Sequence, residues 1–181
     1  MPKHEDAVEM FYSHGADRRA QEADGFLSFG YWSEGARDYD EATEALLEFF
    51  LAEADIRDPE LILNVCCGNG AETTRIYERL RPKKIHGIDI TAPHIQTCRK
   101  RAAELGLSNE LVFQQGDACK TGFPDNTFSH VIGIEGPAHF NTREAFFAEA
   151  YRVLKPGGML MLTDSVIQKK PEGLAEAAVV A

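Results

Sequence analysis

Short apolar segments of strand length alternate with amphipathic segments through most of this chain, and this alternation constrains its fold more than any other feature. The spacing predicts strands over residues 60–65, 83–90, 110–117, 128–135 and 159–166. It predicts helices over residues 40–54, 91–107 and 142–154, and a turn that leads into a helix over residues 68–80. Strands that alternate with helices in this way form βαβ units with right-handed crossovers. We therefore expect an α/β fold, a Rossmann-like parallel sheet with helices on both faces.

Length and charge narrow the class of protein. A chain of 181 residues is expected to form one domain with a single core. The formal net charge of -10 argues against a nucleic-acid partner, since phosphate binding needs a concentrated basic surface. No apolar run is long enough to span a bilayer, and the polar, acidic start MPKHEDAVEM is unlike a signal peptide. We expect a cytoplasmic protein with no membrane partner.

The four cysteines are expected to be thiols, as is usual in the cytosol. Cys66 and Cys67 are neighbours, which disfavours a disulfide between them, and no CxxC spacing occurs. The six histidines are scattered, so no metal site is predicted. The cysteine pair is therefore interpreted as structural and buried.

The stretch LILNVCCGNGAETT (61–74) runs from the first strand into a glycine turn and then a helix. Ligands bind beyond the carboxyl ends of such strands, where glycines allow close backbone approach and the helix offers free N–H groups. The dinucleotide fingerprint GxGxxG needs a third small residue, and Thr73 stands there instead. Asp89 follows 19 residues after Gly70, at the end of the second strand, where it can accept from ribose hydroxyls. These features favour an adenosine without phosphates.

Four segments resemble the class I S-adenosylmethionine (SAM)-dependent methyltransferases, in the small-molecule branch that includes quinone, tocopherol and sarcosine-type enzymes. They are LILNVCCGNG, GIDI, GDACKTGFPDNTFSHVIGIE and REAFFAEAYRVLKPGGMLMLTD. FLSFGYW (26–32) more loosely resembles the segment that closes over the cofactor in this branch. The resemblance implies a helical N-terminal cap segment (1–56), a SAM-binding core (57–166) and a C-terminal tail (167–181).

The resemblance also implies site residues, none of them a metal ligand. Gly68 and Gly70 would pass under the methionine part of SAM, and Asp89 would hold its ribose. Contacts to the adenine are implied for Ile90, Asp117 and Ala118, while Tyr31 and Trp32 would form an aromatic lid. Catalytic candidates are Glu135, after the fourth strand, and His139, a base if the acceptor must lose a proton. Each residue type also has a plain structural explanation.

Two positions depart from the family pattern. Asn64 stands where the family usually has an acid, which removes a negative charge that would favour the cofactor's ammonium group. Cys66 replaces the first glycine, and its β-carbon disfavours glycine-only backbone angles. We therefore expect SAM binding to be weaker than in a standard member.

The expected activity is methyl transfer from SAM to a small-molecule acceptor by in-line displacement, with carbon, nitrogen and oxygen acceptors all open. One alternative is a catalytically silent SAM-binding subunit, which the altered first motif allows. The other is a nicotinamide-dependent reductase, against which the Thr73 mismatch and the lack of a Tyr-x-x-x-Lys pair both count.

The end of the chain carries a further expectation. Class I methyltransferases usually add a final antiparallel pair of strands beside the fifth, and only a short segment follows MLMLTDSV here. We therefore expect the last two strands to be missing from the sequence and Met159–Leu162 to form an open sheet edge. Such edges invite pairing, so we expect a homo-oligomer or a fragment of a longer chain.

Overall fold

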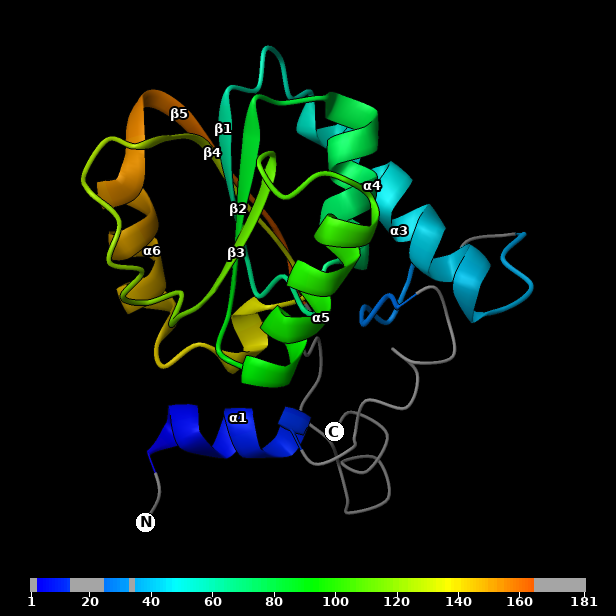
Figure 1. The fold of residues 1–181 in the computed structure, drawn as a ribbon, viewed down its shortest axis with the longest axis horizontal. Helices are drawn as coiled ribbons and strands as arrows, with labels where there is room; N and C mark the ends of the chain where they lie inside the picture. Colours follow the sequence, from blue (N-terminus) through cyan, green and yellow to red (C-terminus); the bar gives the residue numbers. More distant parts are fainter. Residues whose placement is uncertain (1–2, 14–24, 33–34, 165–181) are drawn as a thin grey trace, which may run out of the picture.

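The computed structural model describes residues 3–13, 25–32 and 35–164, and its centre is a parallel sheet. The strands are β1 (Leu61–Val65), β2 (Lys84–Asp89), β3 (Leu111–Gln115), β4 (Phe128–Ile134) and β5 (Leu154–Thr163). Their order is β3-β2-β1-β4-β5, and every adjacent pair is parallel (Figure 1). The predicted α/β class and its five strands are confirmed.

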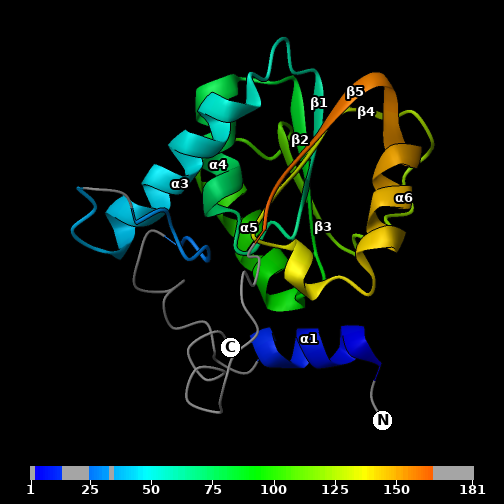
Figure 2. The ribbon, with the colours of Figure 1, turned by 180° about the vertical axis from the view of Figure 1, so that it is seen from behind.

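Helices cover both faces of the sheet. They are α1 (His4–Ser13), α3 (Tyr39–Ala54), α4 (Ala71–Leu80), α5 (Ala92–Glu104), the 3-10 turn η1 (Pro137–His139) and α6 (Arg143–Val153). In Figure 1, α3, α4 and α5 lie on one side of the sheet and α6 on the other, and Figure 2 shows the same division from behind. Helix α1 lies across the carboxyl ends of the strands, so one end of the sheet is covered (Figure 1).

Two apolar clusters fill the space between the sheet and its helices. Side chains alternate along a strand, so Ile62 of β1 enters the cluster under α3, α4 and α5, while Leu63 enters the cluster under α6. Ile132 and Val131 of β4 divide in the same way. The last four residues of β1 (62–65) are buried because both faces of the sheet are covered.

Local signals fix the starts of two helices. The Asp38 side chain accepts from the Glu41 N–H at the start of α3 (3.0 Å), and Thr142 does the same for Ala145 at the start of α6 (3.2 Å). Thr91 is the N-cap residue of α5, but its hydroxyl makes no cap hydrogen bond. Its own N–H instead donates to Asp89.

The end of α6 differs from the prediction. The sequence predicts that KPGG separates this helix from a strand over 159–166, whereas β5 begins at Leu154 and contains KPGG. Phe128 pairs with Leu154 and His130 with Met159, so the extra residues form an irregularity in an extended strand. Pro156 and Gly157 are tolerated because β5 is the edge strand of the described sheet.

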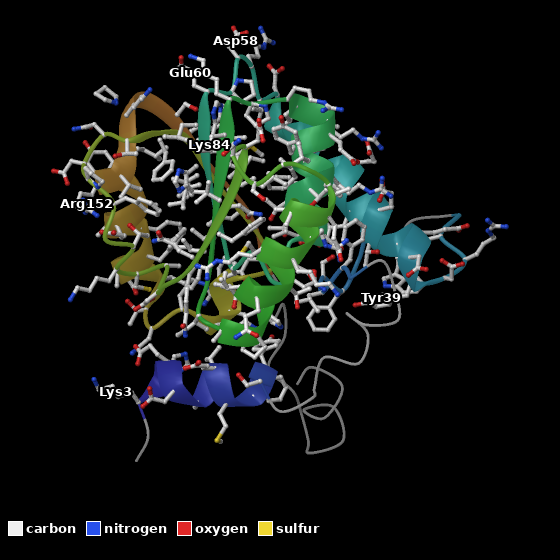
Figure 3. The ribbon with its side chains drawn as sticks, viewed as in Figure 1. Lys3, Tyr39, Asp58, Glu60, Lys84 and Arg152 are labelled. Atoms are coloured by element: carbon white, nitrogen blue, oxygen red, sulfur yellow. The ribbon has the colours of Figure 1, made fainter. Side chains whose placement is uncertain are left out.

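Charged residues cluster at the amino ends of the strands, opposite α1. Figure 3 shows Asp58, Glu60 and Lys84 there. Glu60 pairs with Lys83 (2.8 Å) and Lys155 (3.1 Å), which connects β1 to β5 at the surface. None of the described helices combines the length and the apolar character needed to cross a bilayer. The predicted C-terminal tail (167–181) lies outside the described residues.

Candidate functional site

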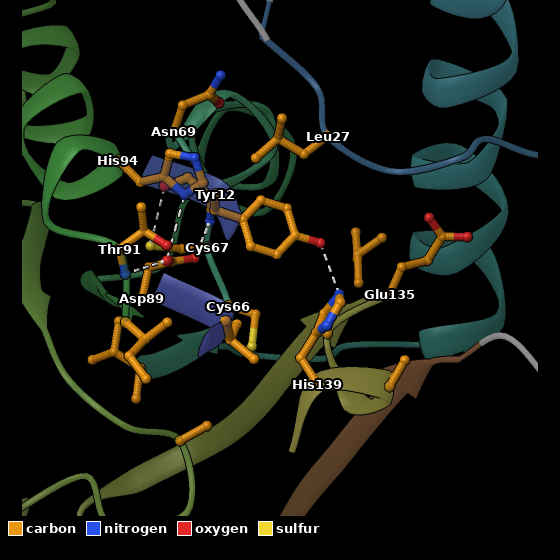
Figure 4. A pocket seen from close by; sticks show the side chains of 18 of the residues that line it. Tyr12, Leu27, Cys66, Cys67, Asn69, Asp89, Thr91, His94, Glu135 and His139 are labelled. Atoms are coloured by element: carbon orange, nitrogen blue, oxygen red, sulfur yellow. Dashed lines mark hydrogen bonds and ion pairs between the residues drawn. The ribbon is translucent and has the colours of Figure 1, made fainter. Parts of the chain in front are cut away.

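A cavity of about 480 Å³ opens at the carboxyl ends of the strands. Its floor consists of the turn after β1 and the residues that follow β2, β3 and β4, and α1 and the segment Gly25–Phe29 contribute the opposite wall. Figure 4 shows Asp89 and Glu135 on opposite sides of it, with Tyr12 and Cys66 between them. This is the edge at which the sequence predicts a ligand.

The turn after β1 has a left-handed backbone at three positions. Cys66 has φ 52°, Gly68 has φ 52° and Gly70 has φ 81°. Gly68 and Cys66 line the cavity, whereas Gly70 does not. A β-carbon on Gly70 would lie 2.9 Å from Cys98 Sγ, so Gly70 allows α5 to pack closely against the turn. All four cysteines are free thiols.

The Asp89 carboxylate accepts hydrogen bonds from two backbone N–H groups of the site. Its Oδ2 accepts from the Gly68 N–H (2.9 Å) and its Oδ1 from the Thr91 N–H (2.8 Å). The side chain is nearly buried, and His94 Nδ1 lies 3.4 Å from Oδ1. An ionised carboxylate has about four acceptor positions, so two amides leave capacity for ligand hydroxyls.

Three more predicted residues line the same end of the cavity: Ile90, Asp117 and Ala118. Asp117 Oδ1 accepts from the Cys119 N–H (2.8 Å), which shapes the turn after β3. Gln115 Nε2 donates to the Ile90 carbonyl (2.9 Å) and so joins the ends of β2 and β3. The structure therefore brings together Asp89, Ile90, Asp117 and Ala118 from two strand ends.

Glu135 stands at the end of β4 with φ 53°, a left-handed backbone that a residue with a β-carbon adopts at a cost. Its carboxylate accepts from the Phe29 N–H, so it holds the segment before α3 over the cavity. Partial burial raises the pKa of Glu135, and this hydrogen bond opposes the rise.

His139 lies in η1 and faces Tyr12 of α1. Tyr12 Oη is 2.8 Å from His139 Nε2, and the two rings meet edge to face (Figure 4). The residue is exposed as a whole, but desolvation of its ring lowers the pKa of His139, which favours the neutral imidazole. His4 Nε2 donates to the His139 carbonyl (3.0 Å), and Asn141 donates to Glu5 (2.8 Å). These contacts hold α1 over the cavity.

Tyr12 and Glu72 are among the lining residues that sequence reasoning missed. Glu72 lies in the first turn of α4, where an acid is ordinary, so nothing in the sequence marks it. Burial raises the pKa of Glu72 to about 7; the nearby Ser28 hydroxyl opposes the shift and Glu135 adds to it. Tyr12 follows no motif, and only the position of α1 reveals it.

Three predicted residues lie away from the cavity lining besides Gly70. Tyr31 is 46% exposed and stacks on Phe49 of α3, and Trp32 is exposed beside it. Asn64 is buried behind the turn, where its Nδ2 donates to Thr73 Oγ1 (2.8 Å). Their implied roles in ligand binding stay predictions.

The charges around the cavity are of one sign. Among the described residues its lining contains no lysine and no arginine. The acids that line it are Glu5, Glu72, Asp89, Asp117 and Glu135. Such a lining favours a ligand with a positive charge and disfavours a phosphate-bearing one.

Comparisons with known proteins agree with this geometry. A family described as a methyltransferase domain matches residues 62–158. The erythromycin 3''-O-methyltransferase of Saccharopolyspora erythraea is 31% identical over 160 residues, which cover 88% of this chain and 51% of that protein. The 27-O-demethylrifamycin SV methyltransferase of Amycolatopsis mediterranei is 30% identical over 148 residues, which cover 82% of this chain and 54% of that protein. The chain thus spans about half the length of these curated relatives.

Solved structures share the fold. The [4+2]-cyclase SpnF superimposes with a TM-score of 0.80 at 24% identity, covering 90% of this chain and 60% of that one. A geranyl diphosphate methyltransferase in complex with GPP and sinefungin gives a TM-score of 0.78 at 18% identity, and the match covers 88% of this chain and 65% of that one.

Proposed function

This chain belongs to the class I SAM-dependent methyltransferases, and we propose that it transfers a methyl group from SAM to a small-molecule acceptor. The observation that carries the proposal is the acidic lining of a cavity at the switch point of a parallel sheet. SAM combines an adenosine with positively charged groups and carries no phosphate. A nicotinamide cofactor would place a pyrophosphate among carboxylates that no described lining lysine or arginine offsets.

The residues present fit the two ends of such a cofactor. Asp89 retains acceptor capacity for the ribose hydroxyls, and Ile90, Asp117 and Ala118 line the space beside it for the adenine. Gly68 exposes backbone at the turn, and Glu135 lies on the far side from Asp89. We propose these residues as the holders of SAM, with Cys66 in contact and with Tyr31, Asn64 and Gly70 acting indirectly.

When bound, SAM supplies a methyl group on a positively charged sulfur, which needs no further activation. The protein then has to align the acceptor and exclude water, and positioning of this kind contributes several kcal/mol. Helix α1 and the segment that ends at Phe29 lie over the cavity and are suited to exclude water. For a hydroxyl acceptor, His139 is proposed to take the proton, because its lowered pKa keeps it neutral near pH 7.

Calorimetry with SAM, S-adenosylhomocysteine and NADH tests the cofactor, and a radiolabelled methyl-transfer assay over a metabolite panel tests the reaction. We expect the two adenosyl compounds to bind, NADH not to bind, and one small-molecule class to be methylated. Binding of NADH alone would overturn the proposal. Binding of SAM without turnover on any panel member would favour the catalytically silent subunit. The departures of Asn64 and Cys66 from the family pattern support that alternative.

The setting of the protein is also proposed. A cytoplasmic location is supported by the free thiols, and a partner other than nucleic acid by the net charge of -10. Self-association, or a longer chain, is proposed to cover β5, the edge strand of the described sheet, whose Met159 is 40% exposed. Light scattering coupled to size exclusion measures the mass directly.

A further inference from the structure

The negative charge that the family usually carries at the end of β1 is absent here. Asn64 stands at that position, and its amide is committed to Thr73 behind the turn. It is 4% exposed and does not line the cavity. A positively charged group of the ligand therefore finds no carboxylate at the end of β1.

Two carboxylates from other elements line the same cavity. Glu72 lines it from the first turn of α4 and Glu135 from the end of β4. Glu135 accepts from the Phe29 N–H, next to Ser28 in the chain, and its charge raises the pKa of Glu72. No lysine or arginine among the described lining residues neutralises them. Two acids that lie near each other are costly to ionise together, and a bound cation would lower that cost.

A buried hydroxyl lies at the same place. Ser28 lines the cavity, is 4% exposed, and its Oγ has no described partner within hydrogen-bond distance, although the hydroxyl is near enough to Glu72 to lower the pKa of that acid. A buried polar atom without a partner costs free energy. A ligand group with several N–H donors could pair with the carboxylates and donate to this hydroxyl oxygen, which would remove that cost.

A purely structural role does not explain why Glu72 lies in the cavity lining. An acid in the first turn of a helix normally stays in water, where the helix dipole favours its charge. Glu72 is only partly exposed and faces a second acid, so its place in the helix does not explain its position in the cavity.

We propose that Glu72, with Glu135 and Ser28, forms the binding site for the ammonium group of the SAM methionine moiety, in place of the missing carboxylate at the end of β1. The inference rests on the proposed function, since it assigns residues to a part of its cofactor. It assigns no role in the transfer step itself.

The test compares two ligands that differ only in the amino group. They are S-adenosylhomocysteine and its deaminated analogue, which keeps the nucleoside, the thioether and the carboxylate. Affinities for both are measured by calorimetry with the wild-type chain, Glu72→Gln and Glu135→Gln. Glu78→Gln is the matched control, because Glu78 lies on the same helix, is exposed and does not line the cavity.

Glu72→Gln is expected to weaken S-adenosylhomocysteine about 10- to 100-fold and to change the affinity for the deaminated analogue less than about twofold. Glu135→Gln should show the same selectivity, and Glu78→Gln should bind both ligands as the wild type does. Equal losses for both ligands, or no loss for either, in a folded Glu72→Gln variant would overturn the inference. Failure of the wild type to bind S-adenosylhomocysteine would instead overturn the proposed function. If Glu72→Gln does not fold, Ser28→Ala provides the same ligand comparison with a smaller expected selectivity.

Discussion

The Gly68 amide donates a 2.9 Å hydrogen bond to Asp89 Oδ2, which joins the turn after β1 to the end of β2. The same carboxylate accepts from the Thr91 N–H at the start of α5. Asp89 therefore organises two backbone segments of the site in addition to its proposed contact with the ribose. The effects of an Asp89 substitution on the free energy of unfolding and on ligand affinity therefore have to be measured separately.

Asp89→Ala is expected to lower the free energy of unfolding by about 2 kcal/mol or more, because two backbone N–H groups lose their acceptor. It should also weaken S-adenosylhomocysteine by roughly 1.5–3 kcal/mol, since the ribose hydroxyls lose charge-assisted hydrogen bonds. Urea unfolding and calorimetry measure the two effects, with the exposed Glu104→Gln as control. An unchanged dissociation constant in a folded variant would remove the ribose assignment.

Cys66 holds a left-handed backbone with φ 52° although it carries a β-carbon. Cys66→Gly should therefore be more stable than Cys66→Ala by about 0.5–1 kcal/mol, because both lose the thiol but only glycine adopts this backbone freely. Thermal unfolding of the pair measures the difference. Equal stability would mean that the left-handed backbone carries no strain.

Gly136 lies against Cys66. A β-carbon on Gly136 would come within 2.7 Å of both Cys66 Cβ and Cys66 Sγ. Gly136→Ala should therefore destabilise the protein by about 1–3 kcal/mol, and by less when Cys66 is already glycine. A double-mutant cycle on unfolding free energies measures this coupling. Additive effects would show that the two residues do not compete for space.

The strands and the cavity floor could be predicted from the sequence because they depend on local patterns. Apolar runs mark β1 to β4. Asp89 ends β2, and Gly68 and Asp117 follow β1 and β3, whose carboxyl ends meet at the same edge. Parallel topology then brings them together without any knowledge of long-range contacts.

The cover of the cavity could not be predicted in this way. Phe29 reaches Glu135 across 106 positions, and Tyr12 reaches His139 across 127, and no periodicity records such contacts. In the sequence, Glu72 is an ordinary acid in the first turn of a helix. Only the tertiary fold places it in the cavity lining. The extension of β5 through KPGG was missed because proline and glycine normally end elements, and an edge strand tolerates them.

Glu72 should make stability depend on pH. Its pKa of about 7 in the folded chain exceeds the ordinary value of 4.5, so the folded protein keeps this proton to higher pH than the unfolded chain does. Its favourable contribution is full below pH 4.5 and is lost as the pH rises toward 7. Glu72→Gln should reduce the fall in stability between pH 5 and 8 and be more stable than the wild type at pH 8 by ~1–3 kcal/mol.

Urea unfolding at several pH values measures this dependence, and Glu78→Gln should retain the wild-type slope. Part of the fall should remain in Glu72→Gln, because burial also raises the pKa of Glu135. A wild-type slope in Glu72→Gln would show that Glu72 titrates normally in the folded protein.

His139 is the residue whose proposed role depends most on the acceptor. Desolvation lowers its pKa below 6.5, and Tyr12 Oη lies 2.8 Å from Nε2, so the ring is held in place and is neutral at pH 7. With a hydroxyl acceptor, His139→Gln should lower kcat by roughly 10²- to 10⁴-fold and leave the affinity for S-adenosylhomocysteine within about twofold. Tyr12→Phe keeps the aromatic ring and removes only the hydroxyl, so it should lower kcat by less than His139→Gln does.

The pH profile provides a second measurement. Because the His139 ring must be neutral and the pKa of His139 is lowered, wild-type kcat/KM should stay constant down to pH 6.5 and fall only at more acidic pH. An unchanged kcat in His139→Gln, with the acid limb still present, would assign the titrating group elsewhere.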